Sequence, residues 1–129
     1  MNITENTVAI VSGGASGLGA AAATALAEAG AKLVILDMND TAGTARAEAL
    51  GGKFIKTDVS DPTSVATAME AVKATFGTAH IAVNCAGIAP AAKTVSKGAA
   101  HDPKSFIATI NVNLIGTFNM NARRIYGLF

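Results

Sequence analysis

The fold of this chain is decided in the stretch Ser12-Gly13-Gly14-Ala15-Ser16-Gly17-Leu18-Gly19. This stretch directly follows the apolar run Val8-Ala9-Ile10-Val11 and precedes an alanine-rich segment from Ala20 to Ala29. The order predicts a buried strand that turns on glycines into a helix. Such a turn directs free backbone N–H groups and the positive end of the helix dipole at one point, and the missing side chains let an anion approach. The stretch therefore predicts a phosphate-binding turn.

Strand and helix patterns alternate along the rest of the chain. Strands are predicted over 8–11, 32–37, 54–59 and 81–84, and helices over 17–29, 39–50, 62–76 and about 103–120. Asp61-Pro62 and Asp102-Pro103 each pair an N-cap residue with a proline at the first helical position. This alternation predicts one α/β domain over 1–129, a Rossmann-type doubly wound parallel sheet with strand order 3-2-1-4. Ligands of such sheets bind where strands 1 and 4 diverge, at their carboxyl ends.

An acid at the end of the second strand indicates which ligand the turn would hold. Asp37 lies 18 residues after Gly19, where a carboxylate can accept hydrogen bonds from both hydroxyls of a ribose. The same carboxylate would repel a 2′-phosphate, which carries about −1.5 to −2 charges. Met38 follows, and no arginine stands beside it to receive that phosphate. The pattern favours NAD over NADP.

Composition excludes several other classes of protein. The formal charge is +1 and the charged residues are scattered, so we expect no nucleic-acid surface. A single cysteine, Cys85, excludes an internal disulfide and is typical of a reducing compartment. The N-terminus lacks the cationic start of a secretory signal, and no uncharged apolar run reaches membrane-spanning length. We expect a cytoplasmic domain that does not interact with membranes.

The glycine spacing resembles that of the short-chain dehydrogenase/reductase family, whose signature is TGxxxGxG, with Ser12 in place of threonine. Three later segments agree in order and spacing. Asp58-Val59 resembles the pair that brackets the adenine in this family, Asn84-Cys85-Ala86-Gly87 resembles its NNAG motif, and Asn113-Leu114-Ile115-Gly116 resembles the helix segment with its catalytic asparagine. The segments 87–94 and 110–119 look closest to the type-II 3-hydroxyacyl-CoA dehydrogenases, a group that includes relatives acting on steroid alcohols.

The resemblance implies reversible hydride transfer between NAD and a secondary alcohol, the substrate being a small alcohol or ketone or an acyl-CoA. It implies a dimer or tetramer, joined partly through the helix that contains Asn113. Asn113 is the implied catalytic residue, ordering a water in the proton relay. The residues expected to bind the cofactor are Ser12, Gly13, Ser16, Gly17, Leu18, Gly19, Asp37, Met38, Asp58, Val59, Asn84, Ala86 and Gly87; no metal site is expected.

The family's remaining catalytic residues, a serine and a Tyr-x-x-x-Lys pair, have no counterpart in these 129 residues. Tyr126 is the sole tyrosine, but it follows Asn113 too closely and no lysine comes after it. We therefore expect a chain truncated after the helix at about 103–120, with an open edge at strand 4 and an inactive isolated domain. Phe106, Ile110, Leu114 and Phe118 would then lack packing partners and favour association.

Two other functions remain open at this stage. A naturally short, non-catalytic module would bind a nucleotide or a partner, and micromolar NAD binding by the isolated monodisperse chain would support it. An S-adenosylmethionine methyltransferase also uses a glycine turn and an acid after strand 2. The GxxxGxG spacing, Asp58-Val59 and Asn84-Cys85-Ala86-Gly87 argue against the methyltransferase.

Overall fold

The computed structural model describes residues 2–126, with side chains up to Arg123. Its main sheet has four parallel strands, β1 (Val8–Ser12), β2 (Lys32–Asp37), β3 (Lys53–Lys56) and β4 (Ile81–Asn84). The strand order is β3-β2-β1-β4, which confirms the predicted topology. Strand β3 is shorter than the predicted 54–59, because the chain leaves the sheet at Thr57.

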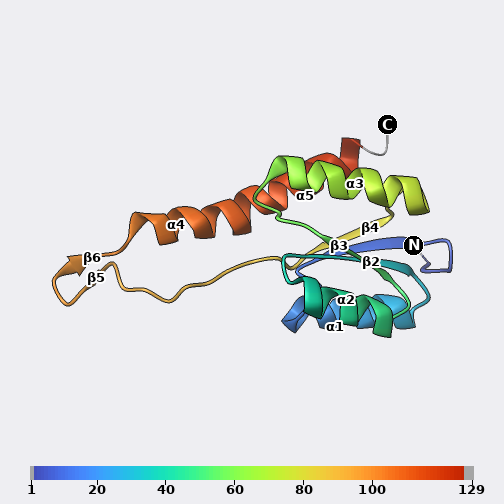
Figure 1. Ribbon diagram of the computed structural model, residues 1–129, viewed down its shortest axis with the longest axis horizontal. Coiled ribbons are helices and arrows are strands. Elements are labelled where there is room, and N and C mark those ends of the chain that lie inside the picture. The colour runs from blue at the N-terminus through green and yellow to red at the C-terminus, as the bar shows by residue number, and fades with distance from the viewer. Residues whose placement is uncertain (1, 127–129) are drawn as a thin grey trace.

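Helices cover both faces of this sheet, as Figure 1 shows. On one face lie α1 (Gly17–Glu28) and α2 (Asp40–Ala49), and on the other lie α3 (Pro62–Phe76) and α5 (Gly116–Tyr126). Successive residues of a strand point to opposite faces of the sheet. Because helices cover both faces, the strand residues that point to either face are apolar. One buried cluster contains Val8, Ile10, Val34, Leu36, Val59, Val65, Ala68, Val72 and Met120. The other contains Val11, Ala23, Leu33, Ile35 and Ala47.

Three helices begin within one residue of the predicted start, and each is capped by a side chain. The Asn39 side chain accepts a hydrogen bond from the backbone N–H of Ala42 at the start of α2. Asp61 and Asp102 accept in the same way at the starts of α3 and α4 (Pro103–Ile110), and a proline follows each of them. Each cap satisfies one of the amides that a helix start leaves unpaired.

The segment after β4 differs from the prediction in two places. The segment 86–100, for which the sequence predicts neither strand nor helix, contains a two-stranded antiparallel hairpin, β5 (Val95–Ser96) and β6 (Ala99–Ala100). Lys97 and Gly98 turn it with positive φ at both residues, which matches the twist of paired strands. The single predicted helix is also wrong, because a π-helical stretch, η1 (Asn111–Ile115), separates α4 from α5.

The hairpin and α4 project beyond the edge of the sheet (Figure 1). Phe106 of α4, Leu114 of η1 and Phe118 of α5 are each more than half exposed, as the sequence predicts for side chains without packing partners, whereas Ile110 is half-buried. None of the described helices is long and apolar enough to span a membrane.

Candidate functional site

A cavity of about 440 Å³ lies at the carboxyl ends of β1, β2 and β4. The glycine turn, the end of β2, the segment after β3 and the segment after β4 all contribute to its lining. Every residue expected to bind the cofactor lines it, except Ser12 and Asn84. The structure also places five residues there that the sequence did not single out as contacts, namely Leu36, Thr57, Cys85, Ile88 and Val112.

The glycine turn is held tightly against the neighbouring strands. Gly13 has φ 68° and donates its N–H to the carbonyl of Leu36 at 2.8 Å. A Cβ on Gly13 would lie 2.6 Å from the backbone N of Ala86, so only glycine fits between β1 and the segment after β4. Ser16 is the N-cap of α1 but makes no side-chain capping bond. The first-turn amides of α1 therefore remain available to a ligand at the floor of the cavity.

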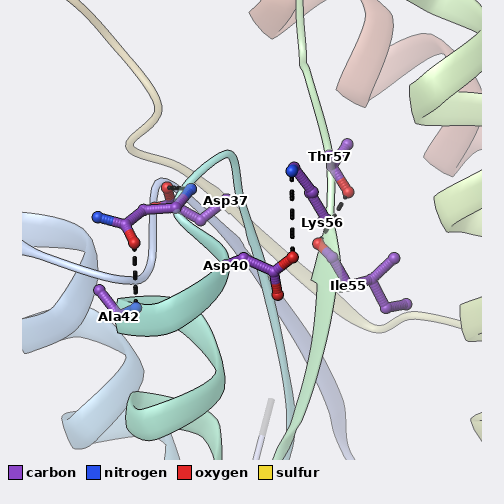
Figure 2. A network of polar contacts seen from close by, with 7 residues as sticks. Asp37, Asp40, Ala42, Ile55, Lys56 and Thr57 are labelled. Carbon is purple, nitrogen blue, oxygen red and sulfur yellow. Dashed lines mark hydrogen bonds and ion pairs between the residues drawn. The ribbon is translucent and has the colours of Figure 1, made fainter.

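Asp37 connects the end of β2 to the glycine turn and to the start of α2. Its Oδ2 accepts from the backbone N–H of Ala15 at 3.1 Å, and its Oδ1 accepts from that of Asn39 at 3.0 Å. A carboxylate has about four lone-pair positions, so acceptor capacity remains for a ligand. Figure 2 shows Asp37 together with Asp40 and Lys56. The exposed side chains of Asp40 and Lys56 form an ion pair, with 4.0 Å between Lys56 Nζ and Asp40 Oδ2.

The segment after β3 forms the next wall of the cavity. Thr57 is buried, and its hydroxyl donates to the Ile55 carbonyl at 3.0 Å (Figure 2). Asp58 Oδ1 accepts from both the backbone N–H and the hydroxyl of Ser60, at 2.9 and 2.6 Å. Val59 is only 6% exposed. The sharp turn at 57–60 thus presents a carboxylate and an aliphatic side chain to the cavity.

Ser12 and Asn84 lie behind the lining, where they hold the walls together. The Ser12 carbonyl accepts from the Cys85 N–H at 3.0 Å, and its buried hydroxyl accepts from the Ala86 N–H at 3.4 Å. Asn84 donates through Nδ2 to Asn121 Oδ1 at 3.0 Å. Among the described residues, no group donates to the buried Asn84 Oδ1.

Asn113 lies in η1 and is also outside the cavity lining. Its Oδ1 accepts from the backbone N–H of Ile88 and its Nδ2 donates to the carbonyl of the same residue, both at 2.9 Å. The side-chain amide is therefore used to fix the segment after β4. The described part of the chain holds no group of three or more His, Cys, Asp or Glu side chains that could hold a metal ion. The Tyr126 side chain lies outside the described residues.

Comparison with known proteins finds relatives along almost the whole chain. A family model described as Enoyl-(Acyl carrier protein) reductase matches residues 13–125. The 3-hydroxyacyl-CoA dehydrogenase type-2 of Homo sapiens is 45% identical over 117 residues, which cover 88% of this chain and 45% of that protein. The Drosophila melanogaster protein of the same name is 42% identical over 120 residues, covering 90% of this chain and 47% of its own length.

More distant relatives extend the comparison. The D-threitol dehydrogenase of Mycolicibacterium smegmatis is 39% identical over 121 residues, or 90% of this chain and 45% of that protein. A crystal structure described as ribose-5-phosphate isomerase from Brucella melitensis 16M matches with a TM-score of 0.88 at 31% identity, covering 98% of this chain and 48% of that one. The chain spans about half the length of the curated relatives that it matches.

Proposed function

Because this chain belongs to the short-chain dehydrogenase/reductase family, a family of oxidoreductases, we propose that its cavity binds NAD and that residues 1–129 are the NAD-binding domain of such an enzyme. The observation that carries the proposal is the convergence of four segments on one cavity. They are the glycine turn, Asp37, Asp58-Val59 and Ala86-Gly87. The first three each have a chemistry that suits one part of a dinucleotide, and Ala86-Gly87 completes the lining.

The residues present fit the cofactor. The first-turn amides of α1 and the dipole of that helix would hold the pyrophosphate, and Gly17, where a Cβ would meet no atom within 4 Å, leaves room for its close approach. Asp37 would accept from the adenosine ribose, with charge-assisted bonds worth roughly 1.5–3 kcal/mol each. Asp58 and Val59 would bracket the adenine. When bound, the cofactor supplies a hydride acceptor.

The preference for NAD over NADP follows from the charge of Asp37. Its carboxylate accepts a hydrogen bond from the Ala15 N–H and therefore faces the glycine turn. A 2′-phosphate on the adenosine ribose that we assign to Asp37 would meet this negative charge. Met38, which follows and lines the cavity, offers no positive charge to offset it. We propose that NADP binds at least about tenfold more weakly, a difference of about 1.4 kcal/mol.

The substrate we propose is a 3-hydroxyacyl-CoA or a similar secondary alcohol, since three of the relatives are dehydrogenases of hydroxyacyl-CoA or polyol compounds by name. Oxidation of an alcohol also requires a base that takes the hydroxyl proton. The titratable side chains of the lining are Asp37, Asp58 and Cys85, and we assign the two acids to the adenosine half. We therefore propose that the 129 residues alone bind cofactor but turn over no substrate.

Calorimetric titration of the folded, monodisperse chain with NAD, NADP and S-adenosylmethionine tests the cofactor. We expect micromolar binding of NAD, weaker binding of NADP and none of S-adenosylmethionine. A folded chain that does not bind NAD would overturn the proposal.

A chimera tests the substrate. In it, this chain replaces the matching segment of the human relative. We expect it to reduce NAD with a 3-hydroxyacyl-CoA, and a folded, NAD-binding chimera that forms no NADH would refute the substrate class.

We further propose that the chain self-associates as a dimer or tetramer. The support is the row of exposed apolar side chains on α4, η1 and α5, among them Phe106, Leu114 and Phe118. Sedimentation velocity of the wild type and of a Phe106→Ser/Phe118→Ser double variant tests this. We expect the wild type to sediment as an oligomer and the variant to be shifted towards monomer; a wild type that stays monomeric contradicts it. The cytoplasmic location expected from the sequence stays a prediction.

A further inference from the structure

The Val59 wall of the cavity is supported from behind by helix α5. Asn119 is 8% exposed, and its Nδ2 donates to the Val59 carbonyl at 2.9 Å, across sixty positions of sequence. Gly116, one turn earlier in α5, is packed against the same residue. A Cβ on Gly116 would lie 2.6 Å from Cγ2 of Val59 and 3.4 Å from its carbonyl carbon.

These contacts fix both the main chain and the side chain of Val59. Among the described residues, no other side chain bonds to the Val59 main chain. A buried carbonyl that loses its donor costs about 1–3 kcal/mol, so the Val59 peptide has a strong preference for the orientation that faces Asn119. Met120, 1% exposed, anchors α5 in the same apolar cluster as Val59. The support is therefore a helix that is itself anchored in the core.

From this geometry we propose that Asn119 and Gly116 are positioning residues for the adenine side of the nucleotide site. Neither residue lines the cavity. They act through Val59, whose position decides how closely that wall fits a flat ring. The inference rests on the proposed binding of NAD, and it assigns a ligand-related role to two residues of α5 that are not among those expected to bind the cofactor.

The test compares AMP, ADP and NAD in calorimetric titrations of the wild type and Asn119→Asp. Aspartate has nearly the size of asparagine, but it replaces the donor that faces the Val59 carbonyl with an acceptor. We expect the affinities for all three ligands to fall at least about tenfold, which corresponds to about 1.4 kcal/mol. The ratio of ADP to AMP affinity reports on the phosphate-binding turn, and we expect it to stay within about twofold of the wild type.

Two further variants separate positioning from general loss of stability. Leu33→Ala removes a buried side chain on the opposite face of the sheet and should cost about 2–5 kcal/mol of stability. At a temperature where it is folded, it should keep wild-type AMP affinity. Gly116→Ala introduces a better helix former, yet its methyl group would press on Val59, so we expect weaker AMP binding.

The outcomes separate this inference from the proposed function. A folded wild type that binds neither NAD nor AMP overturns the proposed function, and this inference with it. If folded Asn119→Asp binds AMP, ADP and NAD with wild-type affinity, the inference is overturned and the proposed function is not. The same follows from a loss of AMP affinity in Leu33→Ala as large as that in Asn119→Asp, or from an ADP-to-AMP ratio that changes with Asn119.

Discussion

Replacing Gly13 by alanine tests how the phosphate-binding turn is built, and Gly17→Ala is the matched control. Both glycines have positive φ, 68° and 53°, so both substitutions force a Cβ into left-handed backbone. That conformation costs a non-glycine residue about 1–2 kcal/mol. The two sites differ in what the new methyl group meets. At Gly13 it lies 2.6 Å from Ala86 N and 2.7 Å from the Cys85 carbonyl carbon, whereas at Gly17 it meets no atom within 4 Å.

The atoms that face Gly13 cannot easily give way. They belong to a main chain that hydrogen bonds tie to Ser12, through the Cys85 and Ala86 N–H groups. Forcing a methyl group into such a contact adds about 1–3 kcal/mol. The sum for Gly13→Ala is about 2–5 kcal/mol, against about 1–2 kcal/mol for Gly17→Ala. Since domains are stable by only about 5–15 kcal/mol, the first change removes a large share of the total.

Urea unfolding followed by circular dichroism measures both free energies. We expect Gly13→Ala to be less stable than Gly17→Ala by at least about 1 kcal/mol, with equal denaturant slopes. NAD binding should weaken in Gly17→Ala despite its small loss of stability, because Gly17 lines the cavity. If Gly13→Ala proves as stable as Gly17→Ala, the contact between the turn and the segment after β4 does not constrain the glycine, and the reasoning is refuted.

Three further changes test other parts of the site. Asn113→Ala removes both hydrogen bonds to Ile88 and should reduce hydrogen-exchange protection of the Ile88 amide by at least about tenfold; unchanged protection contradicts the role of Asn113 in fixing this segment. Asp37→Ser should raise the affinity for NADP relative to NAD by at least about tenfold, and an unchanged ratio in paired titrations would show that charge does not set the preference. Lys56→Ala should change the free energy of unfolding by less than about 0.5 kcal/mol, because its ion pair with Asp40 is exposed; a loss above about 1 kcal/mol in the urea assay would contradict this.

The sheet order and most helix starts could be predicted because their determinants are local. An apolar run before a glycine turn identifies a strand, and Asp61-Pro62 identifies a helix start, each within a few residues of sequence. The hairpin at 95–100 carries no such pattern, since two-residue strands are too short for an alternation to register. Its turn depends on a positive φ at Lys97, a conformation that lysine rarely adopts.

The π-helical stretch had a weak indication in the sequence. Phe106, Ile110, Leu114 and Phe118 recur every four residues. Since one turn of an α-helix takes 3.6 residues, each of these side chains would lie about 40° further around the helix axis than the one before it. A wider turn compensates such a drift. Sequence alone could not place it at 111–115, because the contact of Asn113 with Ile88 joins segments 25 positions apart.

Residues that face the cavity and residues that support it from behind differ in how far sequence can identify them. The lining residues lie at strand ends, where a motif and the topology together specify their place. Asn119 and Gly116 support Val59 from helix α5, and no sequence pattern near either residue indicates its contact with Val59. The same holds for Asn121, which bonds to Asn84. Since a protein interior is close-packed, a shift of these supports moves the wall itself. Substitutions chosen from the motifs would reach some of these supports, among them Ser12, Asn84 and Asn113, but would leave Asn119 and Asn121 untested.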